Sequence, residues 1–243
     1  MQTILVLNSK GGSGKTTVAT NIASLFVSGG ISCAIMDYDP QGSSLYWQSL
    51  RDPARPKIHV VDASSTKNKQ TRTWQLKLPP ETERVIIDAP AGAEGLVLQE
   101  MIRRTQMIIV PVAPSPIDIH ATSDFIKDLL LIGKIRRLGI RIAVIANRVR
   151  RHTPTYEPLE KFLSNLKIPF VTTLSDSDNY IIAAEQGIGI HEMDNEETGP
   201  EREQWLPLAR WLALDGQDVS QREHGGRNNS NIQPISLAVR HQR

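Results

Sequence analysis

The sequence is short of the residues that build disulfides, metal clusters and membrane spans. Cys33 is the only cysteine among 243 residues, and one thiol cannot form an intrachain disulfide or a cysteine-ligated zinc or iron–sulfur site. It lies in an apolar stretch, which predicts a buried structural thiol. No apolar run approaches the ~18 residues of a membrane-spanning helix, and the N-terminus lacks the pattern of a signal peptide. We therefore expect a soluble, cytoplasmic protein with no membrane partner.

An excess of one charge is also absent. The 28 Lys and Arg residues against 26 Asp and Glu residues leave a formal net charge of +2. Any binding to nucleic acid must therefore come from a local patch rather than from the charge of the whole molecule. Hydrophobic residues make up 40% of the chain and charged residues 22%, a normal balance for a globular domain with a sizeable core.

Short apolar runs alternate with helix-like patterns through most of the chain. Nearly continuous apolar strands separated by helices are typical of a parallel sheet covered on both faces. We therefore predict the α/β fold class, with a mainly parallel twisted sheet and right-handed crossovers. The expected strands are Thr3–Leu7, Cys33–Met36, Ile58–Val61, Val85–Ile87, Met107–Val112, Ile142–Ile145 and Phe170–Thr173. The expected helices are Lys15–Val27, Leu96–Arg103, Ile119–Leu138, Pro158–Leu166, Asn179–Gln186 and Glu203–Leu214.

The domain organisation follows from a change in composition after Gly216. We expect a single domain over residues 1–214 and a polar tail over residues 215–243 that is mostly disordered, because it is rich in Gln, Asn, Arg, Ser and Gly. Alternating apolar residues over 235–240 could pair with a partner, but a flexible tail is the better explanation. A second polar stretch, Ser64–Thr73, is expected to be an exposed loop.

The strongest motif is a glycine-rich segment that follows the first predicted strand and opens the first predicted helix. Glycines let successive backbone N–H groups converge on phosphate oxygens, and the helix N-terminus adds partial positive charge. This context predicts a loop that binds the phosphates of ATP, which the protein is expected to hydrolyse slowly. Lys15 would bridge the terminal phosphates, Thr16 would ligate Mg²⁺, and Thr17 would contact an inner phosphate. The loop consists of Lys10, Gly11, Gly12, Ser13, Gly14, Lys15, Thr16 and Thr17.

Aspartates follow two of the predicted strands. Asp88 comes directly after an apolar strand, at the carboxyl edge where ligands bind to open α/β sheets, and it could hold Mg²⁺ through a water molecule. Asp37 and Asp39 follow the second strand. Asp37 would support either the Mg²⁺ shell or the loop itself. Asp39 precedes Pro40, a dipeptide that also fits an ordinary turn.

Lys10, placed immediately before Gly11, gives the loop a deviant form, and with it the chain resembles the ParA/MinD family of ATPases. The resemblance covers roughly residues 1–214. It also rests on four segments at the ends of predicted strands: Asp37–Gly42, Ile86–Pro90, Val110–Asp118 and Ala146–Arg148.

The resemblance implies roles for four residues. Lys10 would cross to the ATP of the other subunit in a sandwich dimer, where a cation supplied in trans neutralises charge on the transferred phosphate. Asp39 would position the attacking water. Asn147 would bind adenine, and Arg148 would either cover the base or be an ordinary surface charge.

Missing features narrow the role within the family. The chain lacks the cysteine pairs of cluster-binding relatives. We expect no N-terminal helix-turn-helix, because the first predicted strand begins at once, and the tail is a poor match to the basic amphipathic helix of membrane-binding relatives. The resemblance therefore implies a small ParA-type homodimer that binds nucleoid DNA non-specifically. It would position a plasmid, a chromosome or a protein assembly such as carboxysomes or chemoreceptor clusters. A ParB-like or cargo-adaptor protein would stimulate hydrolysis. The alternatives are a MinD-like membrane-cycling ATPase and an ATP-dependent synthetase or amidoligase.

DNA binding without sequence preference needs basic side chains that contact phosphates. For any one of them, a solvated surface position is the alternative explanation. The candidates are Arg150, Arg151, Arg202 and Arg210, with Lys161 and Lys167 behind them.

Overall fold

The computed structural model describes residues 1–64, 78–132, 135, 137–150, 153, 156–166 and 168–213. The expected tail, most of the expected loop over 64–73, Arg151 and Lys167 lie outside these residues. All strand pairings in the described sheet are parallel. Its seven strands, in the order β3-β2-β4-β1-β5-β6-β7, are β1 (Gln2–Val6), β2 (Cys33–Asp37), β3 (His59–Asp62), β4 (Arg84–Asp88), β5 (Met107–Val112), β6 (Arg141–Val149) and β7 (Phe170–Ser175).

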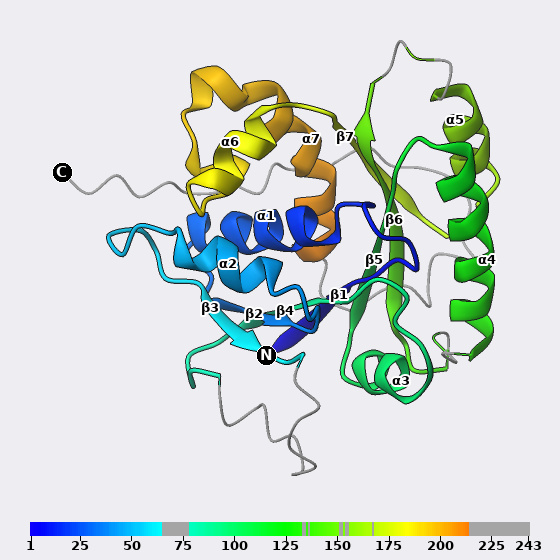
Figure 1. The fold of residues 1–243 in the computed structure, drawn as a ribbon, viewed down its shortest axis with the longest axis horizontal. Coiled ribbons are helices and arrows are strands. Elements are labelled where there is room, and N and C mark those ends of the chain that lie inside the picture. Colours follow the sequence, from blue (N-terminus) through cyan, green and yellow to red (C-terminus); the bar gives the residue numbers. More distant parts are fainter. Residues whose placement is uncertain are drawn as a thin grey trace, which may run out of the picture.

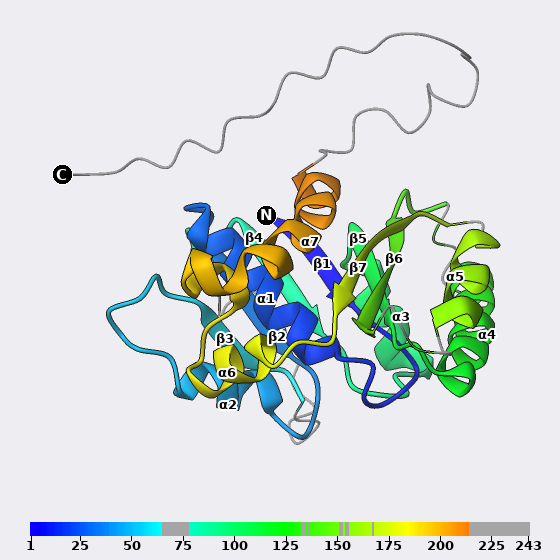
Figure 2. The ribbon, with the colours of Figure 1, turned by 90° about the horizontal axis from the view of Figure 1, so that it is seen from above.

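Helices cover both faces of this sheet, so the predicted fold class is confirmed (Figure 1). One face carries α1 (Lys15–Ser28), α2 (Ser43–Ser49) and α7 (Asn195–Ala213); the other carries α3 (Gly95–Arg103), α4 (Pro116–Ile132) and α5 (Tyr156–Ser164). Figure 2 shows α4 and α5 on the side of the sheet opposite α1 and α7. The short α6 (Asn179–Glu185) and η2 (Ile190–Glu192) connect β7 to α7.

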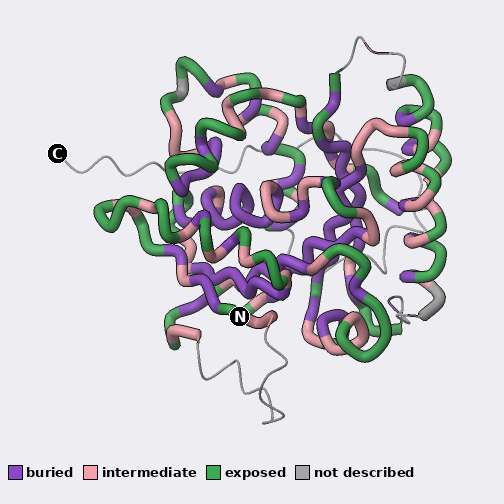
Figure 3. The backbone as a smooth tube through the Cα atoms, in the orientation of Figure 1, coloured by how far each residue is buried: buried purple, intermediate pink, exposed green. Residues whose placement is uncertain are grey.

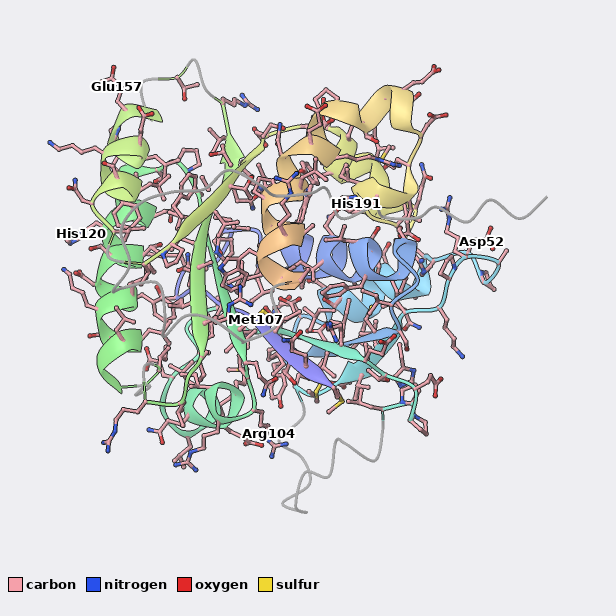
Figure 4. All side chains as sticks on the ribbon, turned by 180° about the vertical axis from the view of Figure 1, so that it is seen from behind. Asp52, Arg104, Met107, His120, Glu157 and His191 are labelled. Carbon is pink, nitrogen blue, oxygen red and sulfur yellow. The ribbon has the colours of Figure 1, made fainter. Side chains whose placement is uncertain are left out.

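The alternation of side chains along β1 divides the core into two layers. Ile4 and Val6 pack with α1, α2 and α7, whereas Leu5 and Leu7 pack with α3, α4 and α5. All four side chains are fully buried, as expected for a strand covered on both faces. Figure 3 shows the strands as mostly buried tube, with exposed positions on the outer sides of the helices. His120 on α4 and Glu157 on α5 lie on that outer surface (Figure 4).

The structure also bears on the buried thiol and the membrane spans considered from the sequence. Cys33 is buried, and burial raises the pKa of its thiol to about 12, so it is the structural thiol that the sequence predicts. Within the described part of the chain, no helix combines the length and apolarity that crossing a membrane requires.

The seven expected strands are all present, but three helices differ from the prediction. The short helix α2 is not predicted at all. The last helix begins at Asn195 instead of Glu203, with Pro200 and Pro207 inside it. Proline normally interrupts a helix, but here the fully buried Trp205 and Leu208 hold the segment against the sheet. Conversely, α4 ends at Ile132 and a turn occupies residues 137–139, so the predicted extension to Leu138 is wrong.

Candidate nucleotide site

The predicted phosphate loop connects β1 to α1, as its sequence context requires. Gly14 adopts a left-handed backbone with φ 84°, and a Cβ atom there would lie 2.1 Å from Asn147 Nδ2. Only glycine fits this position, for both conformation and space. The Asn147 amide in turn donates a hydrogen bond of 2.9 Å to the carbonyl of Ser13. The end of β6 therefore supports the loop directly.

Lys15 is pre-positioned inside the loop. Its side chain is buried, and Nζ donates a 3.0 Å hydrogen bond to the carbonyl oxygen of Lys10. Burial lowers the pKa of Lys15, while the carboxylates of Asp88 and Asp39 oppose that shift. An ammonium group has three donors, so two remain for phosphate oxygens. Lys10 itself is half-buried at the start of the loop.

Three neighbouring strands end in aspartate at the same edge of the sheet. Asp37 on β2 is in register with Asp62 on β3 and with Asp88 on β4. Asp37 is fully buried and accepts hydrogen bonds from the backbone N–H groups of Asp39, Ser44 and Leu45, at 3.0, 2.9 and 3.2 Å. Burial raises the pKa of Asp37, and these three donors oppose the shift. Of the two roles expected for Asp37, the geometry favours support of the loop.

Asp88 has very different surroundings. It is 1% exposed, and Oδ2 accepts a 2.8 Å hydrogen bond from the Ser44 hydroxyl. Among the described residues, the buried Oδ1 has no hydrogen-bond partner. Burial raises the pKa of Asp88 to about 6, and the Ser44 and Thr16 hydroxyls act against that rise. A buried carboxylate oxygen without a donor is unusual, and it fits the outer coordination shell of Mg²⁺.

The expected Mg²⁺ site does not depend on a cage of protein ligands. Within the described residues, no group of three or more His, Cys, Asp or Glu side chains could hold a metal ion. Mg²⁺ in nucleotide sites keeps several waters and binds one or two protein groups plus the phosphates. Thr16 and Asp88 fit that arrangement, and their assignment as metal-binding residues stays a prediction.

Asp39 lies in the turn between β2 and α2. Its Oδ1 accepts a hydrogen bond of 2.9 Å from the Gln41 N–H, and its carbonyl accepts one from Gly42 N–H. This is the turn that the Asp39-Pro40 dipeptide indicates. Asp39 is only half-buried and lies near enough to influence the pKa of Lys15. A role in positioning water is compatible with this place and stays a prediction.

The two residues expected near adenine differ in their environment. Asn147 is buried and its amide is used by Ser13, so its contact with adenine stays a prediction. Arg148 is exposed and has φ 55°, a left-handed conformation, beside a register shift between Ala146 and Val149. A non-glycine residue in this conformation is strained, and such strain concentrates at functional sites.

The candidate DNA-binding residues that the structure describes do not form one patch within a subunit. Arg150 follows the carboxyl end of β6, where it pairs with Asp176 at 2.7 Å. Arg210 is exposed on α7 beside Trp211, whose carbonyl binds Arg141 at the start of the same strand. The length of β6 separates these ends by about 30 Å. Lys161 is exposed on α5, a third location.

Arg202 has a structural position that the sequence does not reveal. Its guanidinium donates to the carbonyl of Ile190 at 3.1 Å and to the carbonyl of Met193, and it is half-buried. These bonds attach α7 to the segment around η2. Its geometry therefore favours a structural role over the predicted DNA contact, because these donors are already used within the fold.

Sequence reasoning missed two residues that organise the site. Asn8 is fully buried between β1 and the phosphate loop, and Ser44 connects the carboxylates of Asp37 and Asp88. The one available signal for Asn8 is a polar residue at the end of an apolar strand. Ser44 carries no signal, because the helix that it begins was not predicted.

A cavity of about 440 Å³ adjoins the loop on the side of α2 and α6. Thr16 and Thr17 line it at the start of α1, and Trp47, Tyr180 and Ile181 add apolar walls. Tyr46 and Ile181 are 67% and 59% exposed at its rim. The phosphate loop therefore borders an open, partly apolar surface.

Comparison with known proteins agrees with this geometry. Over 175 residues, the chain is 27% identical to "Maintenance of carboxysome distribution protein A" of Halothiobacillus neapolitanus, covering 70% of this chain and 77% of that protein. The solved structure of the MinD cell division protein of Aquifex aeolicus matches with a TM-score of 0.65 at 18% identity, covering 90% of this chain and 98% of MinD.

A further match concerns a protein solved with a nucleotide analogue. A putative plasmid partition protein from Borrelia burgdorferi bound to AMPPNP matches with a TM-score of 0.64 at 17% identity, covering 87% of this chain and 98% of that protein. At such identities, these structural matches show a shared fold. The family model of the CobQ/CobB/MinD/ParA nucleotide binding domain matches residues 4–190. The chain, with its deviant phosphate loop, therefore belongs to the CobQ/CobB/MinD/ParA family of nucleotide-binding domains.

Proposed function

We propose that this protein is a ParA-type ATPase, which dimerises around ATP, binds DNA without sequence preference and positions a cargo. The observation that carries the ATPase part is that the Lys15 ammonium and an Asp88 oxygen without a hydrogen-bond partner among the described residues lie at one glycine loop. The names of its relatives, a carboxysome distribution protein and a plasmid partition protein, support a positioning role.

In this proposal, each residue at the loop has one task. The backbone N–H groups of the loop and the Lys15 ammonium hold the phosphates. Thr16, and Asp88 through a water molecule, would hold Mg²⁺, which would supply positive charge beside the phosphate oxygens. Asp39 orients the attacking water, and Lys10 of the second subunit stabilises the transition state. Two subunits are then needed for fast turnover.

The remaining parts of the proposal concern partners and location. Arg150 and Arg210 stay candidates for phosphate contacts on DNA, each contributing from a different edge of the subunit. Dimerisation would bring basic residues of two subunits to one surface. A ParB-like or cargo-adaptor protein would stimulate hydrolysis and release the nucleoid-bound dimer.

Four measurements test this function. We expect Lys15→Ala to abolish ATP binding, while Lys127→Ala, an exposed lysine on α4 paired with Asp124, keeps it. We expect Asp39→Ala to keep ATP binding and lose turnover, which traps the dimer for analytical ultracentrifugation. The trapped dimer should co-sediment with unrelated DNA sequences equally, and added salt should weaken this binding steeply.

The same material separates the alternative functions. ATP consumption that requires a small carboxylate, without DNA affinity, would identify a synthetase or amidoligase. ATP-dependent binding to anionic liposomes would identify a membrane-cycling ATPase. DNA binding that does not respond to salt, or turnover by Asp39→Ala equal to that of the unmodified protein, would contradict the proposal.

A further inference from the structure

Asn8 connects the phosphate loop to the middle of the core. Its side chain is fully buried, and Nδ2 donates to the carbonyl of Pro111 at 2.7 Å and to Thr122 Oγ1 at 3.2 Å. Its Oδ1 accepts the backbone N–H of Lys10 at 3.2 Å. A carbonyl only accepts and a backbone N–H only donates, so these partners fix the orientation of the amide.

The Asn8 side-chain amide supplies a hydrogen bond that the backbone of β1 no longer provides at this point of the sheet. Leu7 N–H donates to Ile109 carbonyl at 3.0 Å, beyond the last paired residue of β1. Bonds in a parallel ladder recur at every second residue, so the next acceptor on β5 is the Pro111 carbonyl. Asn8 supplies the donor from its side chain. The main chain can therefore leave the sheet and enter the loop while the buried Pro111 carbonyl keeps a hydrogen-bond donor.

Lys10 is held at both ends of its backbone. Its N–H is bound by Asn8, and its carbonyl accepts from Lys15 Nζ at 3.0 Å and from Ser13 Oγ at 3.3 Å. The Lys15 and Ser13 contacts come from the loop itself, whereas the Asn8 contact leads to β5 and α4. Of the three contacts to the Lys10 backbone, the one with Asn8 is the link to the core, beside the bond from the Gly92 N–H to the Ser9 carbonyl of the same peptide unit.

We propose that Asn8 is a positioning residue that aims Lys10 at the ATP of the second subunit. The inference rests on the proposed function, because it gives Lys10 its role in trans. A lysine side chain is long and flexible, so the accuracy of its placement depends on how firmly its backbone is held. Displacement of a catalytic group by about 1 Å can cost up to about a hundredfold in rate.

The test compares single and double variants of the full-length protein. Asn8→Ala should lower the ATP-dependent dimer affinity and kcat by about ten- to hundredfold. The affinity of the monomeric Asn8→Ala variant for ATP should change by less than about threefold, because Lys15 and the glycines of the loop remain in place. Asn8→Ala combined with Lys10→Ala should be no worse than Lys10→Ala alone, since both act on one step.

A matched control separates positioning from general loss of stability. Asn21 is also buried, and its amide likewise bridges two backbone groups, the Thr17 carbonyl at 2.8 Å and the Ile190 N–H at 2.8 Å. Asn21→Ala should lower thermal stability as much as Asn8→Ala. Its effect on kcat should be small and should add to that of Lys10→Ala.

A milder variant covers the case in which Asn8→Ala does not fold. Thr122→Val removes one of the two acceptors of Asn8 Nδ2 and keeps the volume of the side chain. We expect it to lower kcat about two- to fivefold, in line with one hydrogen bond. Thr105→Val, which removes another buried threonine hydroxyl bonded to the Met101 carbonyl at 2.8 Å, should leave kcat unchanged.

The outcomes distinguish the two ideas. If Lys10→Ala lowers dimerisation and kcat but Asn8→Ala does not, the positioning role of Asn8 is overturned and the proposed function stands. If the losses of dimer affinity and kcat in the double variant of Asn8→Ala and Lys10→Ala are the sum of the single losses, the positioning role of Asn8 is likewise overturned. If Lys10→Ala changes neither quantity, both the role of Lys10 and that of Asn8 are overturned.

Discussion

Three aspartates end neighbouring strands at one edge of the sheet, and they differ in what surrounds them. Asp62 is exposed and accepts bonds from the N–H and hydroxyl of Ser64, at 2.9 and 2.7 Å. Asp37 is buried and receives three backbone N–H groups. Asp88 is buried, its Oδ2 accepts the Ser44 hydroxyl, and its Oδ1 has no hydrogen-bond partner among the described residues. Their residue type and register are the same.

The difference comes from the chain that follows each strand. After β2, Gly42 takes a left-handed backbone with φ 64° and α2 begins, so its first N–H groups point back at Asp37. After β4, the next helix starts only at Gly95. Among the described residues, no backbone N–H group of a helix N-terminus therefore bonds to the Asp88 carboxylate, which receives the Ser44 side-chain hydroxyl instead. A carboxylate becomes available to a ligand when the following segment leaves it without donors.

The largest effect should come from Asp88→Asn. An amide cannot serve as an anionic acceptor for metal-bound water, so we expect Mg²⁺-dependent ATP affinity to fall about 10- to 100-fold. The free energy of unfolding should be unchanged or higher, because the variant no longer buries an ionisable carboxyl group. Titration of a fluorescent ATP analogue with and without Mg²⁺, beside urea unfolding, measures both quantities.

Asp62→Asn is the control for this comparison. It makes the same chemical change on an exposed carboxylate of the same row, and it should alter neither affinity nor stability measurably. Equal loss of Mg²⁺-dependent affinity in both variants would remove the distinction between these two strand ends.

Asp37→Asn should show the opposite pattern to Asp88→Asn. The amide nitrogen would face a backbone N–H group that it cannot accept from, so we expect a loss of about 2 kcal/mol in the free energy of unfolding. The effect on nucleotide binding should follow from the weakened start of α2 and not from Mg²⁺. If Mg²⁺-dependent affinity falls while urea unfolding is unchanged, Asp37 belongs to the metal shell after all.

The row of aspartates also marks the limit of sequence reasoning. Apolar runs predicted all seven strands and the order of glycines and lysine predicted the loop, because these signals are local. The partners of Asp37 depend on α2, which has no apolar period long enough to recognise. The structural role of Arg202 depends on carbonyls at Ile190 and Met193, which only the folded chain brings near it.

Ser44→Ala should have a smaller effect on Mg²⁺-dependent ATP affinity. Ser44 bonds to both buried carboxylates, and the substitution removes only one of these two bonds. The Ser44 N–H to Asp37 remains, but the hydroxyl bond to Asp88 is lost. We expect about a tenfold loss of Mg²⁺-dependent ATP affinity, typical of a residue that orients a ligand. Ser49→Ala, a hydroxyl at the other end of α2 that donates to Tyr46 carbonyl, is the control. A change in unfolding free energy without a change in affinity would assign Ser44 to the scaffold alone.

The smallest expected effect is the dependence of folding stability on pH. It has to be separated from any effect of pH on the carboxylates of the site. His191 on η2, labelled in Figure 4, lies 5.8 Å from Trp205 between ring centroids. Burial, with Arg202 nearby, lowers the pKa of His191 to about 4. The unfolded chain, with an ordinary histidine pKa near 6.5, takes up the proton first as pH falls. Folded stability is therefore lost on acidification from about pH 6.5 towards 4.

Between pH 7.5 and 6.0, this single group should cost about 1 kcal/mol of the free energy of unfolding. Urea unfolding at the two pH values should show a smaller drop in His191→Gln, while His120→Gln, whose side chain is 83% exposed, should keep the full drop. If His191→Gln keeps the full drop, the acid sensitivity lies elsewhere. If the drop disappears, the stability of the His191→Gln variant no longer changes with pH over the range in which Asp88 changes its charge. The pH dependence of ATP binding measured in this variant then comes from the nucleotide site and not from His191 on η2.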